Sequence, residues 1–531
     1  MKRIYSYRLV YVTIICVLIV FIIVNNNSNN KDPNDFRFLE YTVSELQEGF
    51  DNGDFSITDV TKAYLKRIAK IDAAGPELHA FITVNPNAIF IAKRLDDELM
   101  NGNKRSPLHG IPVVLKDNID TDDMPTTAGS RALENSIPPE DAFLVKQLEK
   151  AGAIILGKAN LSEWANFRGE LSSSGWSGLG GQTKNPYVLD RNPCGSSSGS
   201  AVAVSANLCV LAIGTETNGS IVCPSHANGI VGIKPTVGLI SRSGIIPISW
   251  TQDTAGPMAR SVEDAVLCLN ALTAEDPEDT KTLQENRVVH QDYTVFLDKN
   301  ALAGKRIGYQ TSYKGINYKV DKLMETAIAE MKRLGAEIIE IGAVREDGTG
   351  DRSFQVMLYE YKDGLNKYFA SLGTQAPVRS LEELIEFNKN DPVEMEFYDQ
   401  RYLEMALEKE DLNSEAYLNA LLKMIMGSRE NGIDFAMDKY DLDAIIAPTG
   451  TPAWKTDHIN GDAFQFGSSS PAAQAGYPNI TVPMGYVDEL PVGISFFGRA
   501  WSEDVLIGIA YAYEQATKVR RVPAFLLNDI K

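Results

Sequence analysis

Lys116, Ser196 and Ser220 stand at three points where a predicted strand or helix meets a turn. Lys116 directly follows the apolar run at 111–115, which predicts a buried strand, and Ser196 precedes a small-residue helix predicted at 198–206. Ser220 lies 24 residues after Ser196, in a second Gly/Ser-containing turn. A serine hydroxyl is a weak nucleophile until a base takes its proton, and burial favours the neutral form of a lysine. These residue types suit serine-based acyl transfer with a lysine as the base.

A second serine pattern, G-x-S-x-G around Ser197, formally matches the nucleophile elbow of serine hydrolases that use histidine. That elbow requires a strand directly before the serine, whereas residues 187–194 are flanked by prolines and predict none. The downstream histidines are His226, His290 and His458. We interpret His226, six residues after Ser220, as structural, and the elbow is the minor alternative.

A third pattern resembles a phosphate-binding loop, with Gly152 followed after four residues by Gly157 and Lys158. Ala159 replaces the Ser or Thr that would hold magnesium, and residues 153–156 have the composition of a strand. The sequence therefore predicts a strand end here and no nucleotide site.

Composition excludes several classes of protein. The 531 residues include 44% hydrophobic ones, too many for a disordered chain, and no glycine period indicates a fibrous repeat. The formal net charge of −19 argues against a nucleic-acid-binding surface, which needs a basic stripe. We therefore expect a small-molecule substrate and no nucleic-acid partner.

The cysteines do not indicate a metal site. Cys16, Cys194, Cys209, Cys223 and Cys268 form no C-x-x-C pair and have no histidine at zinc-binding spacing. Five cysteines in so long a chain also do not make a disulfide scaffold. We expect neither a metal nor an organic cofactor.

The N-terminal sequence predicts a membrane segment. A basic stretch at 1–8 precedes an almost unbroken apolar run at 9–24 and a polar linker at 25–35. The basic side chains are Lys2, Arg3 and Arg8. No small-x-small cleavage site follows the run, which favours an uncleaved signal anchor over a cleaved signal peptide. The positive-inside rule then predicts a single-pass protein at the cell membrane with its main domain extracytoplasmic, or a secreted protein if the segment is cleaved.

The remaining sequence predicts one large α/β domain at 36–531. Ser56 and Asp59 predict a helix cap, and a helical stretch around 143–150 lies between short apolar strands at 111–115 and 153–156. This rhythm indicates a mixed β-sheet core flanked by helices. The more charged and helical stretch at 280–435, apart from a strand–helix–strand unit at 306–341, predicts an inserted cap region.

The chain resembles the amidase signature family of serine hydrolases. The resemblance is dense over 107–265 and weaker over 40–520. The matching segments are 110–117, 195–201, 216–221, 232–238 and 253–257. Residues 164–167, 180–183 and 216–220 are most similar to the peptide amidase branch, which removes the C-terminal amide of peptides. The chain departs from many members at Cys194 and Asn218, where they carry glycine before each catalytic Gly-Ser pair.

The resemblance implies a Ser–Ser–Lys triad in which Ser220 is the nucleophile, Ser196 bridges it to Lys116, and Lys116 is the base. It also implies a cis peptide bond between Gly195 and Ser196 and an acyl-enzyme intermediate. The backbone amides of the turn are the implied oxyanion hole. That turn comprises Thr217, Asn218, Gly219 and Ser220.

The resulting functional hypothesis is an amidase that converts primary amides, with peptide C-terminal amides among the candidates, to carboxylate and ammonia. One alternative is a component of a tRNA-dependent amidotransferase, which shares the signature; the net charge and the predicted anchor argue against it. Another alternative is a surface binding module without catalytic activity. The presence of all three triad residues in the sequence argues against it.

Overall fold

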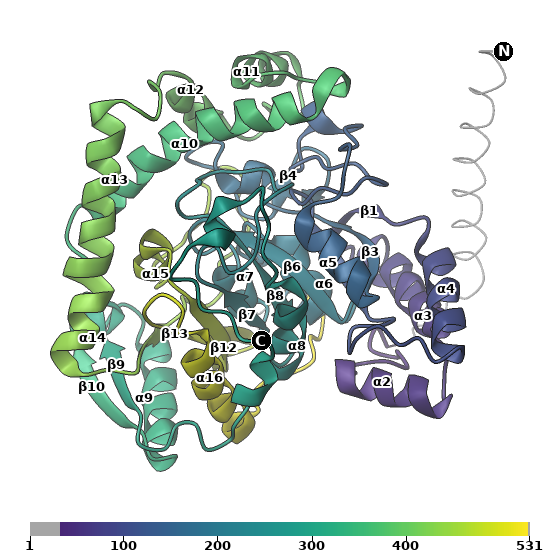
Figure 1. Ribbon diagram of the computed structural model, residues 1–531, viewed down its shortest axis with the longest axis horizontal. Helices are drawn as coiled ribbons and strands as arrows, with labels where there is room; N and C mark the ends of the chain where they lie inside the picture. The colour runs from purple at the N-terminus through teal and green to yellow at the C-terminus, as the bar shows by residue number, and fades with distance from the viewer. Residues whose placement is uncertain (1–31, 529–531) are drawn as a thin grey trace.

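A computed structural model describes residues 32–528 of the chain (Figure 1). Its core is one eleven-stranded sheet in the order β1-β3-β2-β6-β8-β7-β12-β13-β11-β9-β10. The segments β3-β2-β6 and β11-β9-β10 are parallel, and the strands between them are antiparallel. The prediction of a single α/β domain with a mixed sheet is confirmed.

The strands of this sheet, in chain order, are β1 (Phe81–Val84), β2 (Pro112–Lys116), β3 (Ile154–Ala159), β6 (Leu211–Glu216), β7 (Val231–Lys234), β8 (Thr254–Ala259), β9 (Arg306–Gln310), β10 (Glu337–Ile341), β11 (Ala444–Pro448), β12 (Asn479–Val487) and β13 (Leu490–Phe497). A separate pair consists of β4 (Trp176–Ser177) and β5 (Gly181–Gln182). The helices are α2 (Val43–Asn52), α3 (Ile57–Arg67), α4 (Ala88–Met100), α5 (Phe143–Ala151), α6 (Ser198–Ser205), α7 (Val222–Ala227), α8 (Val262–Leu272), α9 (Tyr318–Arg333), α10 (Thr349–Ser371), α11 (Leu381–Asn390), α12 (Arg401–Leu407), α13 (Glu415–Ser428), α14 (Asp434–Tyr440), α15 (Ser470–Ala475) and α16 (Glu503–Thr517).

The central strands are buried on both faces. Every residue of β2, β3, β6 and β8 is buried, and helices α6, α8 and α16 pack against the sheet. Near-continuous runs of Val, Ile, Leu and Ala are typical of strands covered in this way.

The predicted helix start at Ser56 is confirmed. The Ser56 side chain accepts a hydrogen bond from Asp59 N, and the Asp59 carboxylate accepts one from Ser56 N, which completes a capping box for α3. Ile57, Val60 and Tyr64 on one face of α3 are fully buried. Capping satisfies the free amides at the helix start while the apolar face packs on the core.

Helices α10, α11, α12 and α13 form an arch along one side of the molecule, opposite the N-terminal helices α2, α3 and α4 (Figure 1). Side chains of α10 such as Leu358, Tyr361 and Leu365 pack with Trp164 and Phe167 of the core. The strand–helix–strand unit predicted at 306–341 is confirmed as β9, α9 and β10, whose two strands belong to the main sheet. The arch is therefore held on the core by an apolar cluster of its own.

The predicted membrane segment at 9–24 lies outside the described residues. Within residues 32–528, no helix is both long and apolar enough to cross a membrane. The N-terminal anchor remains a prediction from the sequence.

Candidate active site

Three neighbouring elements deliver the predicted site residues to one edge of the sheet. Lys116 is the last residue of β2, and the parallel neighbour β6 ends at Glu216, next to the turn that carries Ser220. Ser196 lies two residues before α6, which packs on both strands. Sites in α/β sheets form at the carboxyl ends of parallel strands because the loops that follow them meet there.

Lys116 and Ser196 are in direct contact. Lys116 Nζ donates hydrogen bonds to Ser196 Oγ at 2.7 Å, to Thr215 Oγ1 at 2.8 Å and to Thr215 O at 3.2 Å. Both Lys116 and Ser196 are 0% exposed. Burial lowers the pKa of Lys116 to about 7, although Asp253 and Glu216 act to raise it. A sizeable neutral fraction of this lysine therefore exists near neutral pH.

Ser220 lies in the neighbouring loop and is more open to solvent than Lys116 and Ser196. Ser197 N donates to Ser220 O at 3.1 Å, which joins the two serine loops through their backbones. Ser220 is 9% exposed, and over residues 32–528 its hydroxyl forms no hydrogen bond. The peptide bond between Gly195 and Ser196 is cis, as predicted. The structure thus brings together Lys116 and Ser196, and the backbone of Ser220 contacts Ser197, the residue that follows Ser196.

The turn that contains Ser220 presents unused backbone donors. Within the described part of the chain, the N–H groups of residues 217–220 donate no hydrogen bond. Glu216 Oε2 fixes the turn by accepting from Ile221 N at 2.8 Å and Val222 N at 3.0 Å. Gly219 has a φ of +86°, a left-handed conformation that favours glycine. The turn is held in shape by Glu216 while its own amides stay available.

Sequence reasoning did not single out Asn118 or Thr215, two polar residues beside Lys116. Asn118 Nδ2 donates to Thr215 Oγ1 at 3.0 Å, so Thr215 links Asn118 to the lysine. Thr217 Oγ1 donates to Asp253 Oδ1 at 2.6 Å, and burial raises the pKa of Asp253 to about 6. Asp253 belongs to the segment 253–257, which matches the amidase signature family. This match was the one feature of the sequence that drew attention to Asp253.

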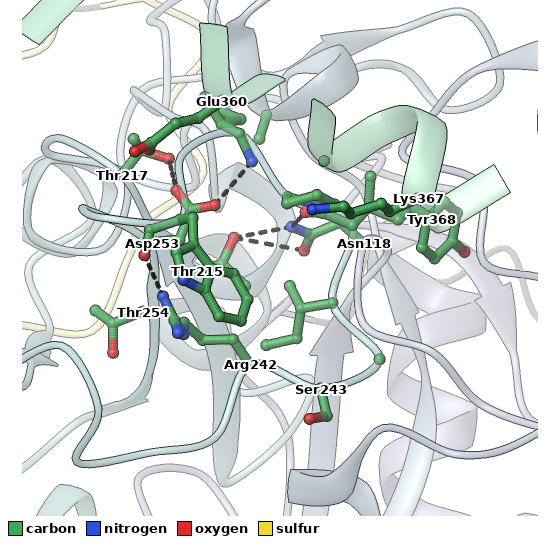
Figure 2. Close-up of a pocket in the computed structure, with 18 of the residues that line it drawn as sticks. Asn118, Thr215, Thr217, Arg242, Ser243, Asp253, Thr254, Glu360, Lys367 and Tyr368 are labelled. Carbon is green, nitrogen blue, oxygen red and sulfur yellow. Dashed lines mark hydrogen bonds between the residues drawn. The ribbon is translucent and has the colours of Figure 1, made fainter. Parts of the chain in front are cut away.

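A cavity of about 670 Å³ borders this cluster (Figure 2). Figure 2 shows Asn118 hydrogen-bonded to Thr215 and, among the other lining residues, Lys367 and Tyr368 of α10. Lys116, Ser196 and Ser220 do not line the cavity, which meets the cluster at Thr215 and Thr217. The rest of the cavity lining comes mainly from the loop at 242–254 and from α10. Because α10 is part of the helical arch, the arch helps to shape the cavity. The volume lies within the range of about 300–1,000 Å³ that is common for small-molecule pockets.

His226 has the environment of a structural residue, which agrees with its interpretation from the sequence. It is 1% exposed, and in the described structure neither ring nitrogen has a hydrogen-bond partner. Burial lowers the pKa of His226 to about 3. Ser197, the candidate of the elbow pattern, instead donates from Oγ to Thr215 O at 3.1 Å. No histidine hydrogen-bonds Ser197 or Ser220 within residues 32–528, which argues against a Ser–His site.

Lys158 of the phosphate-loop pattern lies within β3, as the predicted strand requires. Its Nζ lies 3.3 Å from Asp117 Oδ1 and donates to Thr126 Oγ1 at 2.7 Å. Lys158 and Asp117 are both fully buried. The pattern is thus a strand with an internal ion pair, and no phosphate loop exists there.

Two cysteines form a bond that the sequence did not indicate. Cys194 and Cys223 are joined by a disulfide across a sequence separation of 29 residues, whereas Cys209 and Cys268 are buried free thiols. The separation fits no spacing rule, so the pairing could not be recognised without the fold.

Comparison with known proteins gives one consistent family. The model of the family described as Amidase matches residues 59–507. A probable amidase of Arabidopsis thaliana is 39% identical over 92% of this chain and 93% of its own length. The native peptide amidase of Stenotrophomonas maltophilia superposes with a TM-score of 0.88 at 49% identity, covering 92% of this chain and 99% of the other. One component of the glutamyl-tRNA(Gln) amidotransferase of Thermoanaerobacter pseudethanolicus is 34% identical over 91% of this chain and 97% of its own length.

Proposed function

Because this chain belongs to the amidase family and is a hydrolase of amide bonds, we propose that it releases ammonia from primary carboxamides, peptide C-terminal amides among them, through Ser220, Ser196 and Lys116. The observation that carries this proposal is the contact between Lys116 Nζ and Ser196 Oγ at 2.7 Å. Both groups are fully buried, and the lysine pKa is lowered to about 7.

In the proposed acylation step, neutral Lys116 accepts the proton of Ser196 while Ser196 accepts that of Ser220. Ser220 Oγ then attacks the carboxamide carbon, and the carbonyl π electrons move to oxygen. The relay runs in reverse to protonate the leaving nitrogen, the C–N bond breaks, and ammonia departs from an acyl-enzyme. Water then attacks the ester by the same proton route and releases the carboxylate. Lysine replaces histidine in this scheme because burial brings its pKa near the working pH.

The negative oxygen of the tetrahedral intermediate would lie against the turn at 217–220. Its amides have no competing acceptor in the described structure, and Glu216 holds the turn from behind. Loss of one such donor typically costs ~3–4 kcal/mol of transition-state stabilisation. A fixed set of backbone amides suits this role because it needs no reorganisation when the charge develops.

Two observations support a substrate larger than a simple aliphatic amide. The cavity of about 670 Å³ adjoins Thr217 of the turn and has the size of a pocket for a drug-sized molecule. Solved structures that are 49% identical to this chain are of peptide amidases. We therefore place peptide amides ahead of acetamide-like substrates.

The first experiment measures ammonia release from a matched panel of peptide amides, free amino-acid amides and aliphatic amides. We expect the highest kcat/KM for the peptide amides, and Ser220→Ala should abolish release while the melting temperature stays unchanged. Labelling of Ser220 by a fluorophosphonate provides an independent readout of the nucleophile. A folded protein that Ser220→Ala leaves active would contradict the assignment of the nucleophile.

The similarity to amidotransferase components supports one alternative function. That alternative predicts glutamine-dependent amidation of charged tRNA when the other components of such an enzyme are supplied. The net charge of −19 disfavours tRNA as a partner. Transamidation activity without hydrolysis of any amide in the panel would replace our proposal by this one.

We also propose that the catalytic domain faces an oxidising compartment outside the cytoplasm. The proposal joins the predicted N-terminal anchor with the Cys194–Cys223 disulfide, because disulfides persist mainly in such compartments. Protease added to intact cells should digest the domain if it lies outside. Protection of the domain in intact cells, lost only on lysis, would contradict this location.

A further inference from the structure

The Cys194–Cys223 disulfide connects the two loops that carry the serines. Cys194 lies two residues before Ser196, and Cys223 lies three residues after Ser220. The two Cα atoms are 6.0 Å apart. The bond therefore spans the two loops within three residues of each serine.

Each half of the disulfide is held firmly to its own serine loop. On the Ser196 side, Cys194 N donates to Asn192 Oδ1 at 2.8 Å, and Ser198 Oγ donates to Cys194 O at 2.6 Å. On the Ser220 side, Cys223 belongs to the first turn of α7, and its N–H donates to Gly219 O at 2.7 Å. A displacement of either sulfur atom therefore also displaces the backbone of the adjacent serine loop.

Only non-covalent contacts otherwise join these two segments. Ser197 N donates to Ser220 O at 3.1 Å, and Asn228 Nδ2 donates to Pro193 O at 2.8 Å. A hydrogen bond contributes about 0.5–1.5 kcal/mol net, so such contacts alone permit local opening. The disulfide also packs with Ala227 and Trp454, which fixes its place between the loops.

We propose that the Cys194–Cys223 disulfide is a positioning bond that keeps the Ser196 and Ser220 hydroxyls in register for proton transfer. This inference rests on the proposed function, because it assigns the bond an effect on the same serines. A misplacement of about 1 Å can cost about 10²-fold in rate, so a small relative shift of the loops lowers turnover. The bond does not touch substrate and acts only through the serine loops.

Reduction of this disulfide should release the two serine loops from each other and lower the rate of turnover. A dithiol reductant transfers two electrons and two protons to the disulfide, which becomes two thiols while the dithiol becomes a disulfide. Cys194 and Cys223 are 4% and 9% exposed, so a reductant reaches them slowly from the Cys223 side. Cys209 and Cys268 are fully buried free thiols and supply a matched control pair.

The test begins with a peptide map of the non-reduced full-length protein, in which Cys194 and Cys223 should occur in one cross-linked fragment. The double variant C194A/C223A is then compared with C209A/C268A and the parent. We expect kcat for a peptide amide to fall tenfold or more in C194A/C223A, while KM stays within twofold of the parent. The pH at which kcat/KM reaches half of its maximum should not change. Fluorophosphonate labelling of Ser220 should slow in parallel, whereas C209A/C268A should match the parent.

A second measurement covers the case in which C194A/C223A does not fold. The parent is reduced under native conditions, checked by circular dichroism, assayed, and reoxidised, and activity should fall and return with the cross-link. Two results would overturn this inference alone. One is a peptide map in which Cys194 and Cys223 are both free thiols, and the other is a kcat within twofold of the parent after the disulfide is lost. A parent that hydrolyses no amide would instead overturn the proposed function, and the inference with it.

Discussion

Lys116 and Lys158 lie on neighbouring parallel strands, and both side chains are fully buried. The register pairs Lys116 with Ala159 and Leu115 with Lys158, so the two lysines point to opposite faces of the sheet. Each side chain has been taken out of water, which disfavours its charged form. The two faces of the sheet differ in the hydrogen-bonding and ionic partners that surround the ammonium group.

Lys158 has a carboxylate partner and Lys116 has none. Lys158 Nζ lies 3.3 Å from Asp117 Oδ1, and burial lowers its pKa while Asp117 acts to raise it. In the described structure Lys116 forms no ion pair, and its hydrogen bonds go to Ser196 and Thr215. The proposed mechanism needs a lysine that releases its proton, and hydroxyl partners suit that role better than a carboxylate does. On this proposal the partner, more than the burial, distinguishes Lys116 from Lys158.

The largest effect should come from removing the unpaired lysine. Lys116→Met keeps most of the side-chain volume but cannot accept a proton, and Lys116→Arg keeps a charge that is not lost at ordinary pH. Both should lower kcat/KM by roughly 10³-fold or more, because the members of the proposed triad would act as a unit. Ammonia release measures the loss, and a thermal melt establishes that the fold survives. Activity of folded Lys116→Arg within tenfold of the parent would refute the role of Lys116.

The paired lysine should show the opposite behaviour. Lys158→Met leaves the Asp117 carboxylate buried without its cation, which typically costs ~3–5 kcal/mol of the free energy of unfolding. The fraction that remains folded should keep a kcat within tenfold of the parent, measured per fluorophosphonate-reactive serine. A variant of parental stability that has lost its activity would show that the two lysines share a catalytic role.

A compensating change sharpens this prediction. The double variant Asp117→Asn/Lys158→Met removes both charges and should recover a large part of the stability that Lys158→Met loses, because no isolated charge remains. Denaturant unfolding of the parent, both single variants and the double variant completes the cycle. Equal stabilities of Lys158→Met and the double variant would mean that the ion pair does not explain the loss.

The smallest effect is expected at His226. Its pKa of about 3 and its lack of hydrogen-bond partners in the described structure give it no part in a proton relay near neutral pH. His226→Ala should therefore keep kcat within about tenfold, with any loss due to the cavity left behind. His226→Gln, which fills more of the space, is the matched control. A loss as large as that of Ser220→Ala in both variants would restore a histidine mechanism.

The sequence was sufficient for the parts of the site that depend on local pattern. Lys116 and Ser196 were singled out because each lies in a segment with a recognisable neighbourhood, and they are in contact in the structure. The cis bond was implied by the family resemblance and is present. The end of β6 was less evident, since the strand runs from Leu211 to Glu216, beyond the apolar residues at 209–213. Its last residues are polar and lack an apolar pattern, but the pairing of Glu216 with Thr254 of β8 extends the strand.

The parts that depend on distant contacts were not predictable. Thr215 and Asn118 are single polar residues in segments without a motif of their own, and only the fold brings them to Lys116. The Cys194–Cys223 bond joins residues 29 positions apart without a spacing motif. The cavity beside the site is formed by α10 and the loop at 242–254, so its size could not be inferred from either segment alone.

The pH dependence of kcat/KM for an uncharged peptide amide tests the central claim most directly. Lys116 must be neutral to accept a proton, so the rate should rise with pH through a midpoint near 7 and then level off. Asp253, with a pKa of about 6, is the nearby group that could imitate this limb. The Asp253→Asn variant separates the two, because Asp253 raises the pKa of Lys116. We predict that the limb persists in Asp253→Asn with its midpoint moved to lower pH. A rate that does not change between pH 5 and 9, or a limb that disappears in Asp253→Asn, would contradict the assignment of Lys116 as the base.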